Sequence, residues 1–158
     1  MTVRIKVVDK GAEKLLKKMK SRMGVKIGIV GKSDGDSVEG TTIAYIGAIH
    51  EFGVDTGRVK IPRRSWLRGY INESAPILRK RLRRSIVHAM HLRKTRSLTG
   101  AMQVFGAVAA GEIQRRIARG IPPPNAPITI EIKGSSKPLI DTGRLRQSIT
   151  YEVTGGEK

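Results

Sequence analysis

The chain has 158 residues, no cysteine, and 31 lysine and arginine residues against 13 acidic ones, which gives a formal charge of +18. This length suits one folded domain, and the lack of cysteine excludes disulfide frameworks, thiolate zinc sites and cysteine nucleophiles. The longest apolar runs fall far short of the roughly 20 residues that cross a bilayer, and the first residues show no export signal. We therefore expect a single soluble domain over residues 1–153, with no membrane partner and a disordered tail over 154–158.

The N-terminal third predicts a strand, a helix and a second strand, followed by a loop. Apolar residues alternate with polar ones over 3–7, which is the period of a half-buried strand. An amphipathic helix is predicted over 9–23, because its apolar residues recur at helical spacing. Alternation resumes over 25–29. Residues 31–41 are rich in glycine, serine and acidic residues, so they predict a mobile loop.

The middle of the chain predicts three helices. Thr41 or Thr42 caps a short helix that ends at Gly53. A long basic helix is predicted from Pro76, and a third helix is predicted over 98–117. Small residues on the third helix permit close approach of a neighbour, so we expect the two long helices to pack on each other. The apolar stripe of the basic helix consists of Leu78, Leu82, Ile86 and Met90.

The C-terminal part predicts short elements. The proline run at 122–124 ends the third helix. Isoleucine at every second position then predicts either an edge strand or an extended arm within 121–136. Asp141 or Thr142 caps a brief helical turn, and a last strand is predicted over 149–153. Together these elements predict an α+β fold, in which a small, mostly antiparallel sheet packs against amphipathic helices that include a long basic one.

Positive charge is concentrated in one quarter of the chain. Residues 58–96 carry 13 basic side chains and one acid, which is +12 of the total +18. Most of these are arginines, whose planar guanidinium groups suit carboxylates and phosphates. Because charge of one sign repels itself, we expect an anionic partner, either nucleic-acid phosphates or an acidic protein surface. The candidate contact residues are Arg63, Arg64, Trp66, Arg68, Arg79, Arg81, Arg83, Arg84, Arg93 and Arg96.

No catalytic or metal-binding constellation is apparent in the sequence. His50 and Glu51 begin like the helix of a zinc protease, but Val54 stands where the second histidine of that motif belongs. His88 and His91 lie one helical turn apart, with no acidic or cysteine ligand near them in the sequence. The sequence therefore predicts a protein that is not an enzyme and that has no cofactor and no metal site.

Three stretches, taken in order, resemble one family. They are Ala48–Gly53, Ile61–Arg68 and Lys137–Ile149, and the likeness covers roughly residues 25–153. Together they are similar to neck and tail-completion proteins of long-tailed bacteriophages and prophages. In that family the second stretch commonly reads Ile-Pro-Ala-Arg-Pro-Phe, where this chain reads Ile-Pro-Arg-Arg-Ser-Trp.

The resemblance implies a virion structural protein at the head-to-tail junction, present in the host cytoplasm during assembly and without catalytic activity. Such subunits assemble with copies of themselves into a ring, usually a hexamer. The ring stacks among other neck and tail proteins, namely the head connector or stopper, the tail terminator and the tail tube. The basic residues would then contact other subunits or, without sequence specificity, the packaged DNA. The alternative is a free basic nucleic-acid-binding accessory protein.

Overall fold

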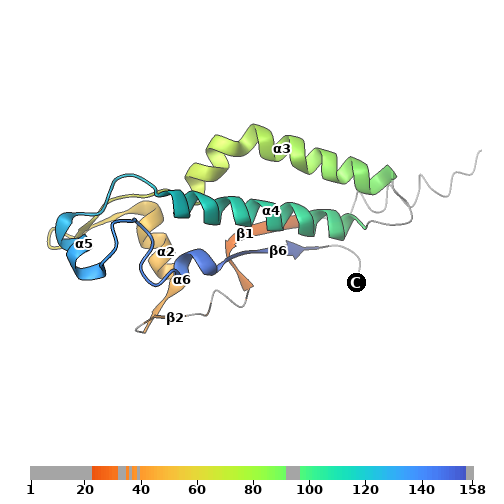
Figure 1. Cartoon of the computed structure of the whole chain (residues 1–158). Coiled ribbons are helices and arrows are strands. Elements are labelled where there is room, and N and C mark those ends of the chain that lie inside the picture. The colour runs from red at the N-terminus through yellow and green to blue at the C-terminus, as the bar shows by residue number, and fades with distance from the viewer. Residues whose placement is uncertain (1–22, 32–34, 36, 39, 92–96, 156–158) are drawn as a thin grey trace, which may run out of the picture.

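Two long helices and a two-stranded ribbon lie in layers along the molecule (Figure 1). The computed structural model describes residues 23–31, 35, 37–38, 40–91 and 97–155. Strand β1 (Gly24–Ile29) pairs antiparallel with β6 (Ile149–Thr154). Helix α4 (Leu98–Arg119) covers one face of this ribbon, and α3 (Arg68–His91) packs on the opposite side of α4. The predicted α+β class, both of these strands and the packing of the two long helices are confirmed.

The shorter elements gather toward one end of the long helices (Figure 1). Two short antiparallel hairpins are among them, β2 with β3 and β4 with β5, and each of their strands has two residues. The bounds of the shorter elements are β2 (Ser37–Val38), β3 (Thr41–Thr42), α2 (Ile43–Phe52), β4 (Val54–Asp55), β5 (Lys60–Ile61), α5 (Pro127–Lys133) and α6 (Arg144–Gln147).

Helix α2 begins and ends where the sequence predicts. The Thr42 hydroxyl accepts a hydrogen bond from the Tyr45 backbone N–H at 3.3 Å, which caps the first turn. At the other end Gly53 adopts a φ of 76° and donates its N–H to the Ile49 carbonyl at 2.7 Å. A left-handed φ favours glycine, so Gly53 is a helix terminator in the usual sense.

Several predictions fall wholly or partly outside the described residues. The structure does not describe the predicted strand over 3–7 or nearly all of the predicted helix over 9–23. It also does not describe residues 32–34, 36 and 39 of the predicted loop. Within that loop, Ser37–Val38 pair with Thr41–Thr42, so this part forms a tight hairpin. The predicted tail begins one residue too early, because Thr154 pairs with Gly24 at the end of β6.

Helix α3 begins eight residues before the predicted start at Pro76, which lies inside the helix. A proline inside a helix removes one hydrogen bond, here to the carbonyl of Asn72, and it bends the helix axis. The helix bends in its first third in Figure 1. Pro76 and Asn72 are both exposed, so this part of the helix is open to solvent and the proline is tolerated.

Helix α5 corrects the prediction of a strand or extended arm over 121–136. The isoleucines at 128 and 132 are four residues apart, so the same residues that alternate in a strand also line one face of a helix. Pro127 occupies the first turn, and Gly134 ends the helix in the left-handed conformation. These two terminal signals decide in favour of a helix.

Helix α6 is the predicted helical turn, but its predicted cap is wrong. Gly143 is the residue before the first turn, and no side chain of Asp141 or Thr142 accepts a hydrogen bond there. Gly143 has a φ of 80°, so the chain enters α6 from a left-handed turn that a glycine adopts without strain.

The hydrophobic core lies where α4 meets the ribbon, α2 and the start of α3. Ile113 of α4 is completely buried, whereas Leu82 of α3 is only partly buried because α3 contacts the molecule on one side. The buried cluster consists of Ile43, Trp66, Tyr70, Ala109, Ala110, Ile113, Ile117, Ile121, Leu139, Leu145 and Ile149.

This difference in burial predicts different costs for two truncations. Ile113→Ala should lower the free energy of unfolding by about 2 to 5 kcal/mol, because it removes buried methyl groups and leaves a cavity. Leu82→Ala should cost clearly less, since part of that side chain already contacts water. Urea denaturation of both variants measures the difference, and equal losses would mean that α3 is packed differently.

Gly106 permits α4 to lie directly on the ribbon. A Cβ at this position would lie 2.5 Å from Cδ2 and 3.0 Å from Cβ of Tyr151, which is closer than any real contact. Gly111 lies one and a half turns further along the same helix, and a Cβ there would meet nothing within 4 Å. A larger residue therefore has no room at position 106, whereas position 111 has room for one.

Gly106→Ala and Gly111→Ala should move stability in opposite directions. Gly106→Ala should destabilise the fold by about 1 to 3 kcal/mol, because Tyr151 or the helix must shift. Gly111→Ala should stabilise it by about 0.5 to 1 kcal/mol, since alanine loses less backbone entropy in a helix. Thermal melts of the pair test this, and a stabilising Gly106→Ala would refute the close contact.

Candidate functional site

The carboxylate of Glu51 joins the stretch Ala48–Gly53 to the stretch Ile61–Arg68. Glu51 is the penultimate residue of α2 and is only 6% exposed. Its oxygens accept hydrogen bonds from the Ser65 hydroxyl at 2.5 Å and from the backbone N–H groups of Leu67 at 2.9 Å and Arg68 at 3.1 Å. Ser65 in turn accepts one from the Gly69 N–H. These donors include the free N–H groups at the start of α3, so a negative charge from α2 caps α3.

Trp66 and two glycines hold the same junction in place. The indole Nε1 donates to the Gly47 carbonyl at 2.9 Å, and the ring is buried in the core. A Cβ on Gly47 would lie 2.9 Å from Cδ1 of Ile29, and one on Gly53 would lie 2.9 Å from the backbone nitrogen of Arg63. The first two stretches therefore form one tightly packed connection between α2 and α3.

Arg64 is a buried structural residue. Its guanidinium donates to the carbonyls of Pro123 at 2.8 Å and Pro124 at 3.0 Å, and to Oδ1 of Asn125 at 3.3 Å. Burial lowers the pKa of this guanidinium from its ordinary value. With 5% of its surface exposed, Arg64 anchors the proline segment that leads to α5 and does not reach a partner.

The third stretch packs its apolar residues into the same core. Leu139, Leu145 and Ile149 are buried with Trp66, and the Ile149 carbonyl accepts a hydrogen bond from the Gln114 side chain at 2.9 Å. Leu139 has a left-handed φ of 63°, which is strained for a residue other than glycine. A cavity of 350 Å³ lies between this stretch and α2, and His50 and Asp141 are among the residues that line it.

Two acid groups connect α3 to α4 through polar contacts. Glu112 of α4 accepts hydrogen bonds from the Tyr70 hydroxyl at 2.6 Å and the Arg81 guanidinium at 2.5 Å. Burial raises the pKa of the Glu112 carboxyl, but these hydrogen bonds outweigh it and leave the pKa below its usual value. Burial and Glu112 also raise the pKa of the Tyr70 phenol. Arg116 forms a two-pronged ion pair with Glu73.

Four of the remaining positive charges of α3 form an exposed face. Arg79, Lys80, Arg83 and Arg84 are all exposed, and the spacing i, i+1, i+4, i+5 places them on one side of the helix. Within the described part of the chain, none of the ion pairs includes these four residues. We call them the basic face. Like charges four residues apart repel each other, so the basic face favours an anionic partner.

The structure separates the ten candidate contact residues into groups. Arg64 and Trp66 are buried, so they are corrected to structural roles. Arg81 is bound to Glu112. Arg63 and Arg68 are exposed near the start of α3, and Arg79, Arg83 and Arg84 belong to the basic face. Arg93 and Arg96 lie outside the described residues. Sequence reasoning missed Glu51 as a cap, because its donors lie 14 to 17 residues away in the chain.

Comparisons of the chain with known protein families, with curated proteins and with solved structures give no match. In the part of the chain that the structure describes, no three histidine, aspartate or glutamate residues gather as metal ligands. None of the described helices has the length and apolar character to span a membrane.

The Glu51 contacts predict a large effect from a small change. Glu51→Gln should lower the free energy of unfolding by about 1 to 3 kcal/mol, because an amide cannot satisfy all three donors and it faces them with donors of its own. As a control, Glu152→Gln removes an exposed acid paired with Lys26 and should change stability by less than about 0.5 kcal/mol. Equal effects in urea denaturation would contradict the capping role.

Proposed function

We propose that the chain is a structural protein of the phage neck, which completes the tail or joins it to the head connector as part of a ring around the DNA passage. The observation that carries this proposal is the convergence of the three phage-like stretches. Although they are separated in sequence, Trp66 and Leu145 both pack against α2 beside Gly47, and Glu51 joins the end of α2 to the residues that follow Trp66. A shared scaffold of this kind supports the resemblance better than scattered matches would.

Individual positions within the second stretch, Ile61–Arg68, also support the proposal. The arginine and the aromatic residue that this chain shares with the family pattern are Arg64 and Trp66, and both are buried with defined partners. Ser65, where the family commonly has proline, bonds to Glu51 and to the start of α3. The matched residues therefore have a structural reason to recur, which supports family membership.

The basic face supplies the surface for partners. A phosphate backbone in the DNA passage, or an acidic surface of a neighbouring subunit, would neutralise charges that are in none of the ion pairs of the described residues. Contacts with phosphate carry no sequence information, so DNA contact here is non-specific. The proposed partners are copies of this chain in a hexameric ring and the neighbouring neck and tail proteins. Its location is the virion neck, after assembly in the host cytoplasm.

Replacing Arg79, Arg83 and Arg84 with glutamine tests the role of the basic face. The melting temperature should stay close to that of the unchanged protein, because exposed charges contribute little to stability. The yield of joined, infectious particles should fall when this variant replaces the chain in its phage or prophage. A matched control replaces Arg58, Arg119 and Lys137, which are exposed on other elements, and removes the same charge.

Three outcomes separate the alternatives. Joined particles at normal yield with the triple variant would contradict an essential basic face. Fully joined particles that lack the chain would contradict a neck role altogether. Tight binding of short duplex DNA by a dilute monomer, with a salt slope that the triple variant lowers by about 3, would instead favour the free nucleic-acid-binding protein.

A further inference from the structure

An apolar groove lies open between α2 and the start of α3. It has a volume of 310 Å³, and its lining includes Ala48, Phe52, Leu67, Arg68 and Ile71. Phe52 is 59% exposed and Ile71 is 43% exposed, although both are large apolar side chains. The Arg68 guanidinium lies over the Phe52 ring, 5.0 Å from its centre, and adds a positive charge to the rim. Large apolar surface left in water around a concave site marks a place where a partner docks.

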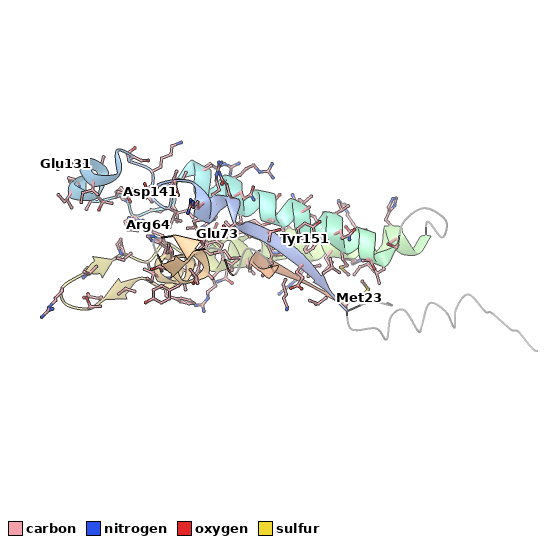
Figure 2. All side chains as sticks on the ribbon, turned by 90° about the horizontal axis from the view of Figure 1, so that it is seen from below. Met23, Arg64, Glu73, Glu131, Asp141 and Tyr151 are labelled. Atoms are coloured by element: carbon pink, nitrogen blue, oxygen red, sulfur yellow. The ribbon has the colours of Figure 1, made fainter. Side chains whose placement is uncertain are left out.

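An apolar knob projects elsewhere on the same molecule. In α5, Ile128 is 61% exposed and Ile132 is 79% exposed, while Thr129 and Ile130 are half-buried. Glu131 lies on the same outer face as the two isoleucines, because the spacing i, i+3, i+4 places them together. Figure 2 shows Glu131 on α5 at one tip of the molecule. A helix of seven residues is too short to be stable by itself. Packing of its exposed apolar face against a partner would therefore stabilise it.

We propose that the α5 knob of one copy inserts into the α2–α3 groove of the next copy. Both surfaces are apolar: exposed isoleucine side chains lie on one, and the other is a groove lined mostly by apolar side chains. They lie on different elements of the chain, so the contact is heterologous and leaves a free knob and a free groove at the two ends of any pair. Repetition of such a contact generates a closed ring or a filament.

Charge favours a second copy as the occupant. At +18 the copies repel each other, so a specific contact between them needs an acid opposite a base. Glu51 caps α3, and Asp55, Glu73, Glu112 and Glu152 each form an ion pair. Of the other described acids, Glu131 and Asp141 are exposed and are in none of these ion pairs. Glu131 is the one that lies on the α5 knob, and Arg68 on the groove rim is its proposed partner. This contact rests on the proposed function, in which copies of the chain form a ring, and it specifies which surfaces of two copies meet.

Site-directed cross-linking tests the contact in the purified full chain, which has no cysteine of its own. Ile128→Cys and Ala48→Cys, made in separate copies and mixed under mild oxidation, should form a disulfide-linked dimer, while Phe52 and Ile132 remain in place. Ala107→Cys, an exposed alanine on α4, replaces Ala48→Cys as the matched control and should form little dimer. A single chain that carries both Ile128→Cys and Ala48→Cys should form a ladder of covalent oligomers.

Charge reversal provides a second readout that does not depend on cysteine chemistry. Glu131→Arg and Arg68→Glu should each raise the dissociation constant for self-association by about tenfold, and the double variant should recover most of the loss. Glu152→Arg reverses an exposed acid on the ribbon and should leave the constant unchanged. Sedimentation velocity over a range of protein concentrations measures each value.

Several results would overturn the proposal. One is a mixed dimer yield no higher with Ala48→Cys than with Ala107→Cys, and another is a double charge variant that is no better than the single ones. Dimers of Ile128→Cys alone at the same yield would indicate a symmetric contact through α5. An intramolecular bond between Leu16→Cys and Ala48→Cys would instead assign the groove to the predicted N-terminal helix. Each of these can occur while the chain is still found in the virion neck, so failure here and failure of the neck role are distinguishable.

Discussion

One buried carboxylate sets the geometry of the molecule. Glu51 lies in the last turn of α2 and at the same time caps the first turn of α3, so the position of the long helix is fixed by hydrogen bonds to a residue in the preceding helix. Because a helix continues in the direction of its first turn, the orientation of the basic face follows from this contact and from the bend at Pro76. Trp66 reinforces the junction from the side of the core.

The chain separates the residues that build the scaffold from those that face outward. The stretches Ile61–Arg68 and Lys137–Ile149 supply buried groups, among them Arg64, Trp66 and Leu145, whose partners lie within the same chain. The surfaces offered to partners come from other residues, namely the basic face of α3, the α5 knob and the rim of the groove. In this division the fold is held by contacts within the chain, and the outward-facing surfaces remain available to partners.

Sequence patterns predicted the elements whose signals are local. The caps of α2 and the long apolar period of α4 contain all the necessary information within the element itself. The start of α3 was missed because Pro76 resembles a first-turn proline, whereas the true cap comes from Glu51. Alternating isoleucines fitted both a strand and a helix at 128–132. Residue type also cannot distinguish Arg64 from Arg68, because burial depends on distant carbonyl groups.

The central claim is that this scaffold presents charged and apolar surfaces that are completed only in an assembly around DNA. Electron cryo-microscopy of intact particles tests it most directly. The account predicts a ring of this chain at the head-to-tail junction, with α5 of each copy in the groove of the next and with the basic face turned toward DNA or an acidic neighbour. A junction without the chain, or a ring in which the basic face and the groove both remain in solvent, would contradict it.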